Sequence, residues 1–176
     1  MKQGIVIYGS HYGATEQYAR EIAKQTGFEC IQFQDIKSLE NYDTIVIGGG
    51  HYAGGITGLE KTMQKLPSQP VDVYIYSVGL SSKTKENLEK VNEAVRKIVP
   101  EEKVEDSHVF YYRGGMDMKK LSFIHKTMMR MMIGMIKKKP ENELTSDDQG
   151  VIDLPNKAVD FVDVTQVNDL VRMIKG

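Results

Sequence analysis

The chain has 176 residues, enough for one domain with a substantial core, and 40% of them are hydrophobic. Its 23 Lys and Arg nearly balance its 24 Asp and Glu, so no overall positive charge favours nucleic acid as a partner. A single cysteine, Cys30, excludes a disulfide framework, and no run of 18 apolar residues predicts a membrane-spanning helix. The first eight residues contain a predicted strand and lack the features of a secretion signal. We therefore expect a single domain over residues 1–176 in a cytoplasmic protein.

The first strand and the turn behind it are the most informative part of the chain. Ile5–Ile7 is an unbroken β-branched run, which is typical of a strand covered on both faces of a parallel sheet. Small or apolar residues at helical spacing follow from Ala14 onward, which predicts a helix directly after the turn. Such a strand–turn–helix aims backbone N–H groups and the positive end of a helix at one place. We interpret this turn as a loop around a phosphate monoester, made by Ser10, His11, Tyr12, Gly13, Ala14 and Thr15.

Strands and helices alternate through the rest of the chain. Further strands are predicted over residues 28–33, 44–47, 71–76 and 108–112, and helices over 57–66, before Pro100 and over 166–175. This alternation predicts an α/β fold with a doubly wound, five-stranded parallel sheet. In one common order of such sheets, 2-1-3-4-5, the winding reverses between the first and third strands, and ligands bind there. The loop 10–15 and the glycine-rich stretch 48–55 follow those two strands.

Other nucleotide and metal motifs do not fit. Gly9 and Gly13 leave no second glycine for a dinucleotide fingerprint, and residues 79–84 lack the second glycine of a phosphate-binding P-loop. The four histidines share no short spacing that predicts a metal site. Hydroxyl groups at Ser10 and Thr15, together with backbone N–H groups, can neutralise a dianionic phosphate without Lys or Arg.

The loop 10–15 resembles the phosphate loop of the flavodoxin family, T/S-x-T-G-x-T. Ser10, Gly13 and Thr15 match this pattern, whereas Tyr12 replaces a hydroxy amino acid and is expected to contribute its backbone N–H only. The resemblance implies a flavodoxin-like fold and flavin mononucleotide (FMN) as the cofactor. It also implies that the loops after the third and fourth strands border the flavin ring, so that the further FMN-binding residues would be Gly50, His51, Tyr52, Ala53, Gly54, Ser77, Val78 and Gly79.

In this family a glycine peptide in the loop after the third strand flips to hydrogen-bond the reduced ring, and Gly49–Gly55 offers several candidates. His51 or Tyr52 would stack on the ring. Three alternatives stay open. Residues 48–55 could be only a flexible surface turn, Tyr52 an ordinary exposed tyrosine, and the loop 10–15 a turn that has lost its flavin.

Residues 116–139, after the fifth strand, predict a basic helical insertion rich in methionine. From Asp117 to Lys139 seven basic residues stand against one acidic residue, a net charge of +6. One helical face carries Leu121, Ile124, Met128, Met131, Met132 and Met135, and a second stripe carries Met129, Ile133 and Ile136. This pattern suits a membrane surface or an adaptable partner groove, or else a helix folded over the edge of the sheet. Residues 140–158 are predicted to be an irregular connection.

With this insertion, the chain resembles the flavodoxin-domain group that contains the menaquinone-dependent protoporphyrinogen oxidases. The resemblance implies an FMN-dependent oxidoreductase that couples a reduced, protoporphyrinogen-like substrate to a quinone, at the inner face of the membrane if the insertion contacts it. A flavodoxin-type electron carrier that docks a redox protein is the second hypothesis, and a flavin-free interaction module is the third. No side chain is predicted to be an obligatory catalytic acid or base.

Overall fold

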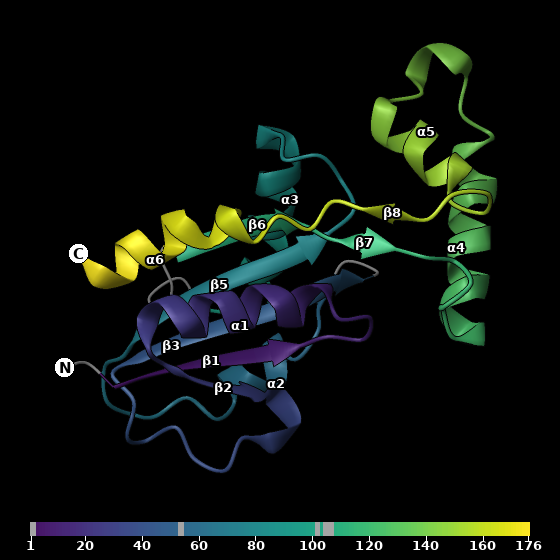
Figure 1. Cartoon of the computed structure of the whole chain (residues 1–176). Coiled ribbons are helices and arrows are strands. Elements are labelled where there is room, and N and C mark those ends of the chain that lie inside the picture. Colours follow the sequence, from purple (N-terminus) through teal and green to yellow (C-terminus); the bar gives the residue numbers. More distant parts are fainter. Residues whose placement is uncertain (1–2, 53–54, 101–102, 104–107) are drawn as a thin grey trace.

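The protein is described by a computed structural model over residues 3–52, 55–100, 103 and 108–176. Within these residues, a parallel sheet has the strand order β2-β1-β3-β5-β6 (Figure 1). Its strands are β1 (Gly4–Gly9), β2 (Glu29–Gln32), β3 (Thr44–Tyr52), β5 (Asp72–Gly79) and β6 (Val109–Arg113). Counted along the chain without the short β4 (Gly55–Ile56), this is the predicted order 2-1-3-4-5. The α/β fold with a five-stranded parallel sheet is therefore confirmed.

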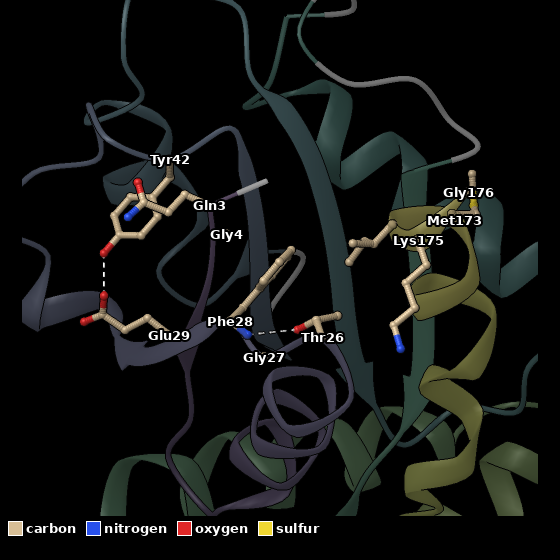
Figure 2. Close-up of a pocket in the computed structure, with 11 residues that line it drawn as sticks. Gln3, Gly4, Thr26, Gly27, Phe28, Glu29, Tyr42, Met173, Lys175 and Gly176 are labelled. Carbon is tan, nitrogen blue, oxygen red and sulfur yellow. Dashed lines mark hydrogen bonds between the residues drawn. The ribbon is translucent and has the colours of Figure 1, made fainter. Parts of the chain in front are cut away.

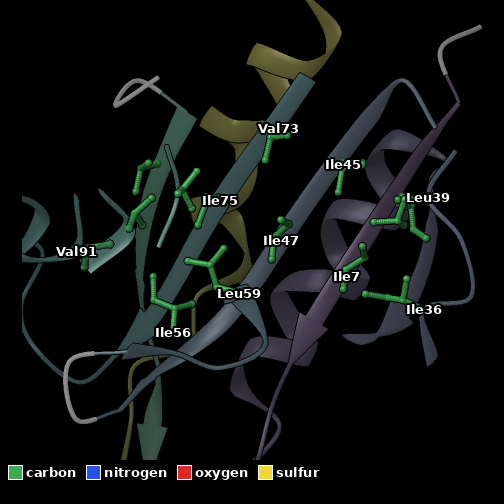
Figure 3. Packing of buried hydrophobic residues seen from close by; sticks show 14 of the residues in the cluster. Ile7, Ile36, Leu39, Ile45, Ile47, Ile56, Leu59, Val73, Ile75 and Val91 are labelled. Carbon is green, nitrogen blue, oxygen red and sulfur yellow. The ribbon is translucent and has the colours of Figure 1, made fainter. Parts of the chain in front are cut away.

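Helices cover both faces of this sheet, because its central strands are apolar on both sides. One face packs on α2 (Leu59–Met63) and α3 (Lys85–Arg96), and Figure 3 shows that part of the core around Ile47 and Ile75. The other face packs on α1 (Ala14–Thr26) and α6 (Asn168–Lys175), which follows a short 3-10 turn, Val164–Val167. A further 3-10 turn, Phe33–Asp35, follows β2.

Two strands extend further than the sequence predicts. Residues 48–52 were expected to form a turn but are the last part of β3, and residues 77–79 are the end of β5 rather than a loop. Gly49 and Gly50 pair with Ser77 and Val78 across the middle of the sheet. Glycine is needed there because the Tyr76 ring and the Thr57 backbone lie against this part of β3 and leave no room for a Cβ. A Cβ at Gly48 would lie 1.9 Å from the Tyr76 ring.

The insertion after β6 is longer and more regular than expected. It opens with β7 (Gly115–Met116) and returns at β8 (Val159–Asp160), which pair antiparallel. Between them lie α4 (Phe123–Ile136), a 3-10 turn (Glu141–Glu143) and α5 (Ser146–Asp153). The prediction that residues 140–158 are irregular is thus wrong. A capping box starts α5, in which Asp148 N–H donates to Thr145 and Thr145 N–H donates to the Asp148 carboxylate.

This insertion lies beyond the carboxyl ends of the strands, at the opposite end of the molecule from both termini (Figure 1). It has a small core of its own around Met118, Leu121 and Leu154. Among the residues that the structure describes, no helix is both long enough and apolar enough to cross a membrane.

Candidate functional site

The turn between β1 and α1 has the backbone shape of an anion loop. Gly13 has a φ of 92°, in the left-handed region that disfavours side chains, and it directly precedes the first residue of α1. Its N–H donates to the Ser10 hydroxyl oxygen at 2.9 Å, which closes the turn. No side chain of the described residues caps α1. The first N–H groups of this helix are therefore free of side-chain partners and point toward the carboxyl edge of the sheet.

The side chains around this helix start suit a phosphate. Because the Ser10 oxygen accepts from Gly13, its hydroxyl hydrogen remains available to an anion. Glu16, the acidic residue of the first turn, is paired with Arg20 at 2.6 Å, so that its charge is balanced. Thr15 is buried, and its carbonyl accepts a hydrogen bond from the Tyr76 hydroxyl at 3.1 Å, which fixes the start of α1 to the sheet.

Four aromatic rings gather beside this loop. His11 and Tyr12 come from the turn, Tyr52 from the end of β3, and His125 from the first turn of α4. The Tyr52 and His125 rings are stacked, with 5.5 Å between their centroids and an angle of 4° between their planes. His11 lies 5.7 Å from Tyr52 and 5.4 Å from His125, edge to face in both cases. We call these four residues the aromatic cluster.

His125 is the member of this cluster that the sequence analysis missed. Its Nδ1 is hydrogen-bonded to the Tyr12 hydroxyl at 2.5 Å, and that hydroxyl oxygen also accepts from Ser122 N–H at 3.3 Å. Ser122 caps α4 by accepting from His125 N–H. In the sequence, His125 stands out only as a histidine in the first turn of an otherwise apolar helix. Tyr12, expected to contribute only backbone, instead joins the loop to the insertion.

His51 and Tyr52 do not share one environment, because successive side chains of a strand point to opposite faces. Tyr52 belongs to the aromatic cluster, whereas His51 Nδ1 lies 3.3 Å from the hydroxyl oxygen of Ser77 on β5. Burial lowers the pKa of His51 below its ordinary value, so its ring is neutral at pH 7. Of the two residues predicted to stack on a planar ligand, the arrangement favours Tyr52.

Comparison with known proteins shows the family of the chain. A family model described as the flavodoxin domain matches residues 5–143. The chain belongs to the flavodoxin domain family.

No curated protein matches it. A flavodoxin from the domain Archaea matches with a TM-score of 0.47 and 20% identity over 63% of this chain and 84% of that one. A flavoprotein from Lactobacillus acidophilus, solved in complex with FMN, has a TM-score of 0.45 and 16% identity over 64% of this chain and 93% of that one.

In this flavodoxin domain the last residues of β5 and the loop behind them make contacts within the protein itself. Ser77 and Val78 are buried in the sheet, and the Gly79 carbonyl accepts from Gly114 N–H at 2.7 Å. Ser82 donates its N–H and its hydroxyl to the Asp147 carboxylate of α5, at 2.8 and 2.5 Å. Burial acts to raise the pKa of Asp147, but these hydrogen bonds outweigh it and lower that pKa. Ser77, at the end of β5, thus contacts β3, and Ser82, in the loop behind it, binds the insertion.

Two of the glycines predicted to flip next to the flavin, Gly50 and Gly55, are held by hydrogen bonds or strand pairing. The Gly50 carbonyl accepts from both the N–H and the hydroxyl of Thr57, at 3.0 and 3.1 Å. Gly55 pairs with Tyr52 in the β3–β4 hairpin. Ala53 and Gly54, the remaining predicted residues of this segment, lie outside the described residues.

A large open pocket of about 930 Å³ lies at the other end of the flavodoxin domain. Figure 2 shows it between Phe28, Tyr42 and the C-terminal end of α6, near the amino ends of β1 and β2. Parallel sheets bind their ligands at the carboxyl ends of the strands, where the loop 10–13 and the aromatic cluster lie. We therefore assign the candidate site to that edge and not to this pocket.

Proposed function

We propose that the chain binds FMN and serves as a flavin-dependent electron-transfer protein. The observation that carries the proposal is the juxtaposition of the uncapped start of α1, behind Ser10 and Gly13, with the aromatic cluster. A phosphate and a flat aromatic ring are the two ends of FMN. Membership of the flavodoxin domain family supports the same cofactor.

The residues have separate roles in this proposal. The Ser10 hydroxyl and the first N–H groups of α1 bind the phosphate, and the αL conformation of Gly13 orients them. Tyr52 and His11 provide ring faces and edges for the flavin, while Tyr12 and His125 hold the insertion against it. The bound flavin supplies the redox chemistry. The protein supplies position and a partly buried surface.

Cofactor release tests the proposal directly. The purified protein should be yellow, and heating should release FMN that is identified by chromatography and fluorescence. Ser10→Ala should weaken FMN about threefold to tenfold, because one hydrogen bond contributes about 0.5–1.5 kcal/mol. Ser38→Ala is the matched control, since the Ser38 hydroxyl also accepts a backbone N–H, that of Glu40, but lies in a remote loop. A colourless protein that does not bind added FMN would leave the flavin-free module as the remaining function.

A more specific function is oxidation of a reduced organic substrate, such as a protoporphyrinogen, with a quinone as the acceptor. The observation that favours it over a carrier of electrons between proteins is the direct contact of the apolar insertion helix with the loop through Tyr12. Stopped-flow absorbance of the reduced protein mixed with menaquinone in detergent distinguishes the two. Fast reoxidation supports the oxidase, and reoxidation only by a redox protein supports the carrier.

A further inference from the structure

The helix α4 exposes a row of large apolar side chains. Ile124, Met128, Met131 and Met135 are spaced by four, three and four residues, so they lie along one line of the helix. The exposed fractions of these side chains and of the neighbouring Phe123 are large: Phe123 83%, Ile124 69%, Met128 44%, Met131 65% and Met135 64%. We call these five residues the apolar row. Contiguous apolar surface of this kind usually marks an interaction site.

The apolar row is separate from the side of α4 that packs against the protein. Ile133 and Ile136 are buried, and Met129 packs on the small core of Met118, Leu121 and Leu154. The stripe of Met129, Ile133 and Ile136 that the sequence shows is thus the side of α4 that packs against the rest of the protein. The apolar row therefore remains exposed after the helix has satisfied its own packing.

The charged residues of the segment that carries this row are all basic. Residues 118–139 contain no Asp or Glu. Arg130 lies within α4, Lys119 and Lys120 precede the helix, and Lys137 and Lys138 follow it. None of these five cations forms an ion pair with a residue in the described ranges, whereas Lys139 is paired with Asp148 at 3.0 Å. These five positive charges, together with that of Lys126 within α4, thus remain without an ion-pair partner among the described residues.

We propose that α4 docks on the surface of an anionic lipid bilayer, with its apolar row among the acyl chains and the five cations at the headgroups. A bilayer provides an apolar layer beneath a negative layer, which matches both chemistries of this face. The same face of a second copy of the chain would match the apolar side chains but not the cations. In a twofold dimer the same cations would face one another at short range and repel.

Docking in this way would bring the candidate site to the bilayer. The first turn of α4 is held to the loop 10–13 by the Tyr12–His125 hydrogen bond at 2.5 Å. The carboxyl edge of the sheet is therefore next to the docked helix, and the large pocket of Figure 2 lies at the far end of the domain. Lipid binding itself does not depend on the proposed FMN function, and it can be tested in protein with or without flavin.

Co-sedimentation with vesicles tests the proposal on the full chain. The protein should bind phosphatidylcholine vesicles that contain phosphatidylglycerol, bind pure phosphatidylcholine weakly, and dissociate as salt is raised. Met131→Glu should weaken binding about tenfold or more, because it removes an apolar side chain that contacts the acyl chains in the docked state and places a negative charge at the lipid surface. Met173→Glu is the matched control on α6, where Met173 is 40% exposed and remote from α4, and it should bind like the wild type.

Several results would overturn the proposal. One is wild-type protein that does not sediment with anionic vesicles, and another is Met131→Glu that binds as tightly as Met173→Glu with an unchanged thermal unfolding curve. Equal affinity for the two lipid compositions would remove the role of the cations. A dimer in sedimentation equilibrium that Met131→Glu dissociates, without vesicle binding, would instead assign the apolar row to a second copy of the chain.

Discussion

Gly13 and Gly27 lie at the two ends of α1 and allow a direct test of the candidate site. Both adopt positive φ, 92° and 76°, and a Cβ at either would meet nothing within 4 Å. Gly13→Ala and Gly27→Ala should therefore each lower the free energy of unfolding by about 1–2 kcal/mol, the cost of the left-handed conformation. Urea denaturation measures this. Only Gly13→Ala should also weaken FMN, in a fluorescence titration, because only Gly13 shapes the loop that we propose binds the phosphate.

Equal loss of FMN affinity in both variants would mean that the effect comes from the stability of α1 and not from the loop. Unchanged affinity in Gly13→Ala would remove the loop from the proposed site.

His51 should make the protein less stable as the pH falls below neutral. Burial lowers its pKa in the folded state, whereas in the unfolded chain the ring titrates near its ordinary pKa of about 6.5. Below that pH the unfolded chain binds a proton that the folded chain does not, so the free energy of unfolding decreases. Urea denaturation at pH 7 and pH 5 should show a larger decrease for the wild type than for His51→Gln. Equal decreases would show that His51 does not contribute.

At the level of single residues, the sequence predicts only the parts of the site that are local. Ser10 and Gly13 lie three positions apart in one turn, and their hydrogen bond is a short-range pattern. The Tyr12–His125 contact joins residues 113 positions apart, and no short-range pattern contains it. It depends on where the insertion packs after the sheet has formed.

Among the elements, the glycine-rich end of β3 shows how composition can mislead. Glycine predicts a turn when it is read for its flexibility, but Gly48–Gly50 form a buried strand in which glycine is needed for close packing. Gly48→Ala should lower the free energy of unfolding by about 3 kcal/mol or more, because the fully buried Tyr76 ring cannot move away.

Gly55→Ala provides the contrast in the same segment. The new Cβ would meet only the Tyr52 carbonyl, at an ordinary 3.7 Å, and the φ of Gly55 is not positive. We expect a change in the free energy of unfolding of less than about 1 kcal/mol. Thermal unfolding of the two variants side by side checks both values, and similar losses would contradict the assigned packing role of Gly48.

The remaining elements were predictable to different degrees. The β-branched runs at Ile5–Ile7 and Thr44–Ile47 identified two central strands, because a doubly covered strand needs continuous apolar residues. The helix α5 was missed, since it is short, contains Gly150 and buries no residue of its own completely. Its capping box, Thr145 and Asp148, was a readable signal that the polar composition of the segment obscured.

On the scale of the whole molecule, the insertion, whose ends pair with each other in the β7–β8 ladder, is hydrogen-bonded to the loops at the carboxyl edge of the main sheet. Asp147 of α5 accepts two hydrogen bonds from Ser82, and Tyr12 binds the first turn of α4. Through these contacts the loop 10–13, the aromatic cluster and the helix that carries the apolar row lie side by side at the carboxyl edge of the sheet. The sequence predicted the sheet and the insertion separately, but this arrangement arises only from their packing.

Hydrogen exchange can test whether the Tyr12 contact holds α4 in place. Tyr12→Phe removes the hydrogen bonds of the Tyr12 hydroxyl with His125 and with Ser122 N–H, which together hold the first turn. At about 0.5–1.5 kcal/mol for each of the two bonds, their loss should speed exchange of the amides of that turn about fivefold or more, while α5, held by Asp147, stays unchanged. Tyr42→Phe, which breaks a hydrogen bond with Glu29 far from the insertion, is the control. If both variants leave α4 protected equally, the aromatic cluster does not join the insertion to the loop. Faster exchange confined to Tyr12→Phe would show that the Tyr12 hydroxyl holds the first turn of α4 against the loop 10–13.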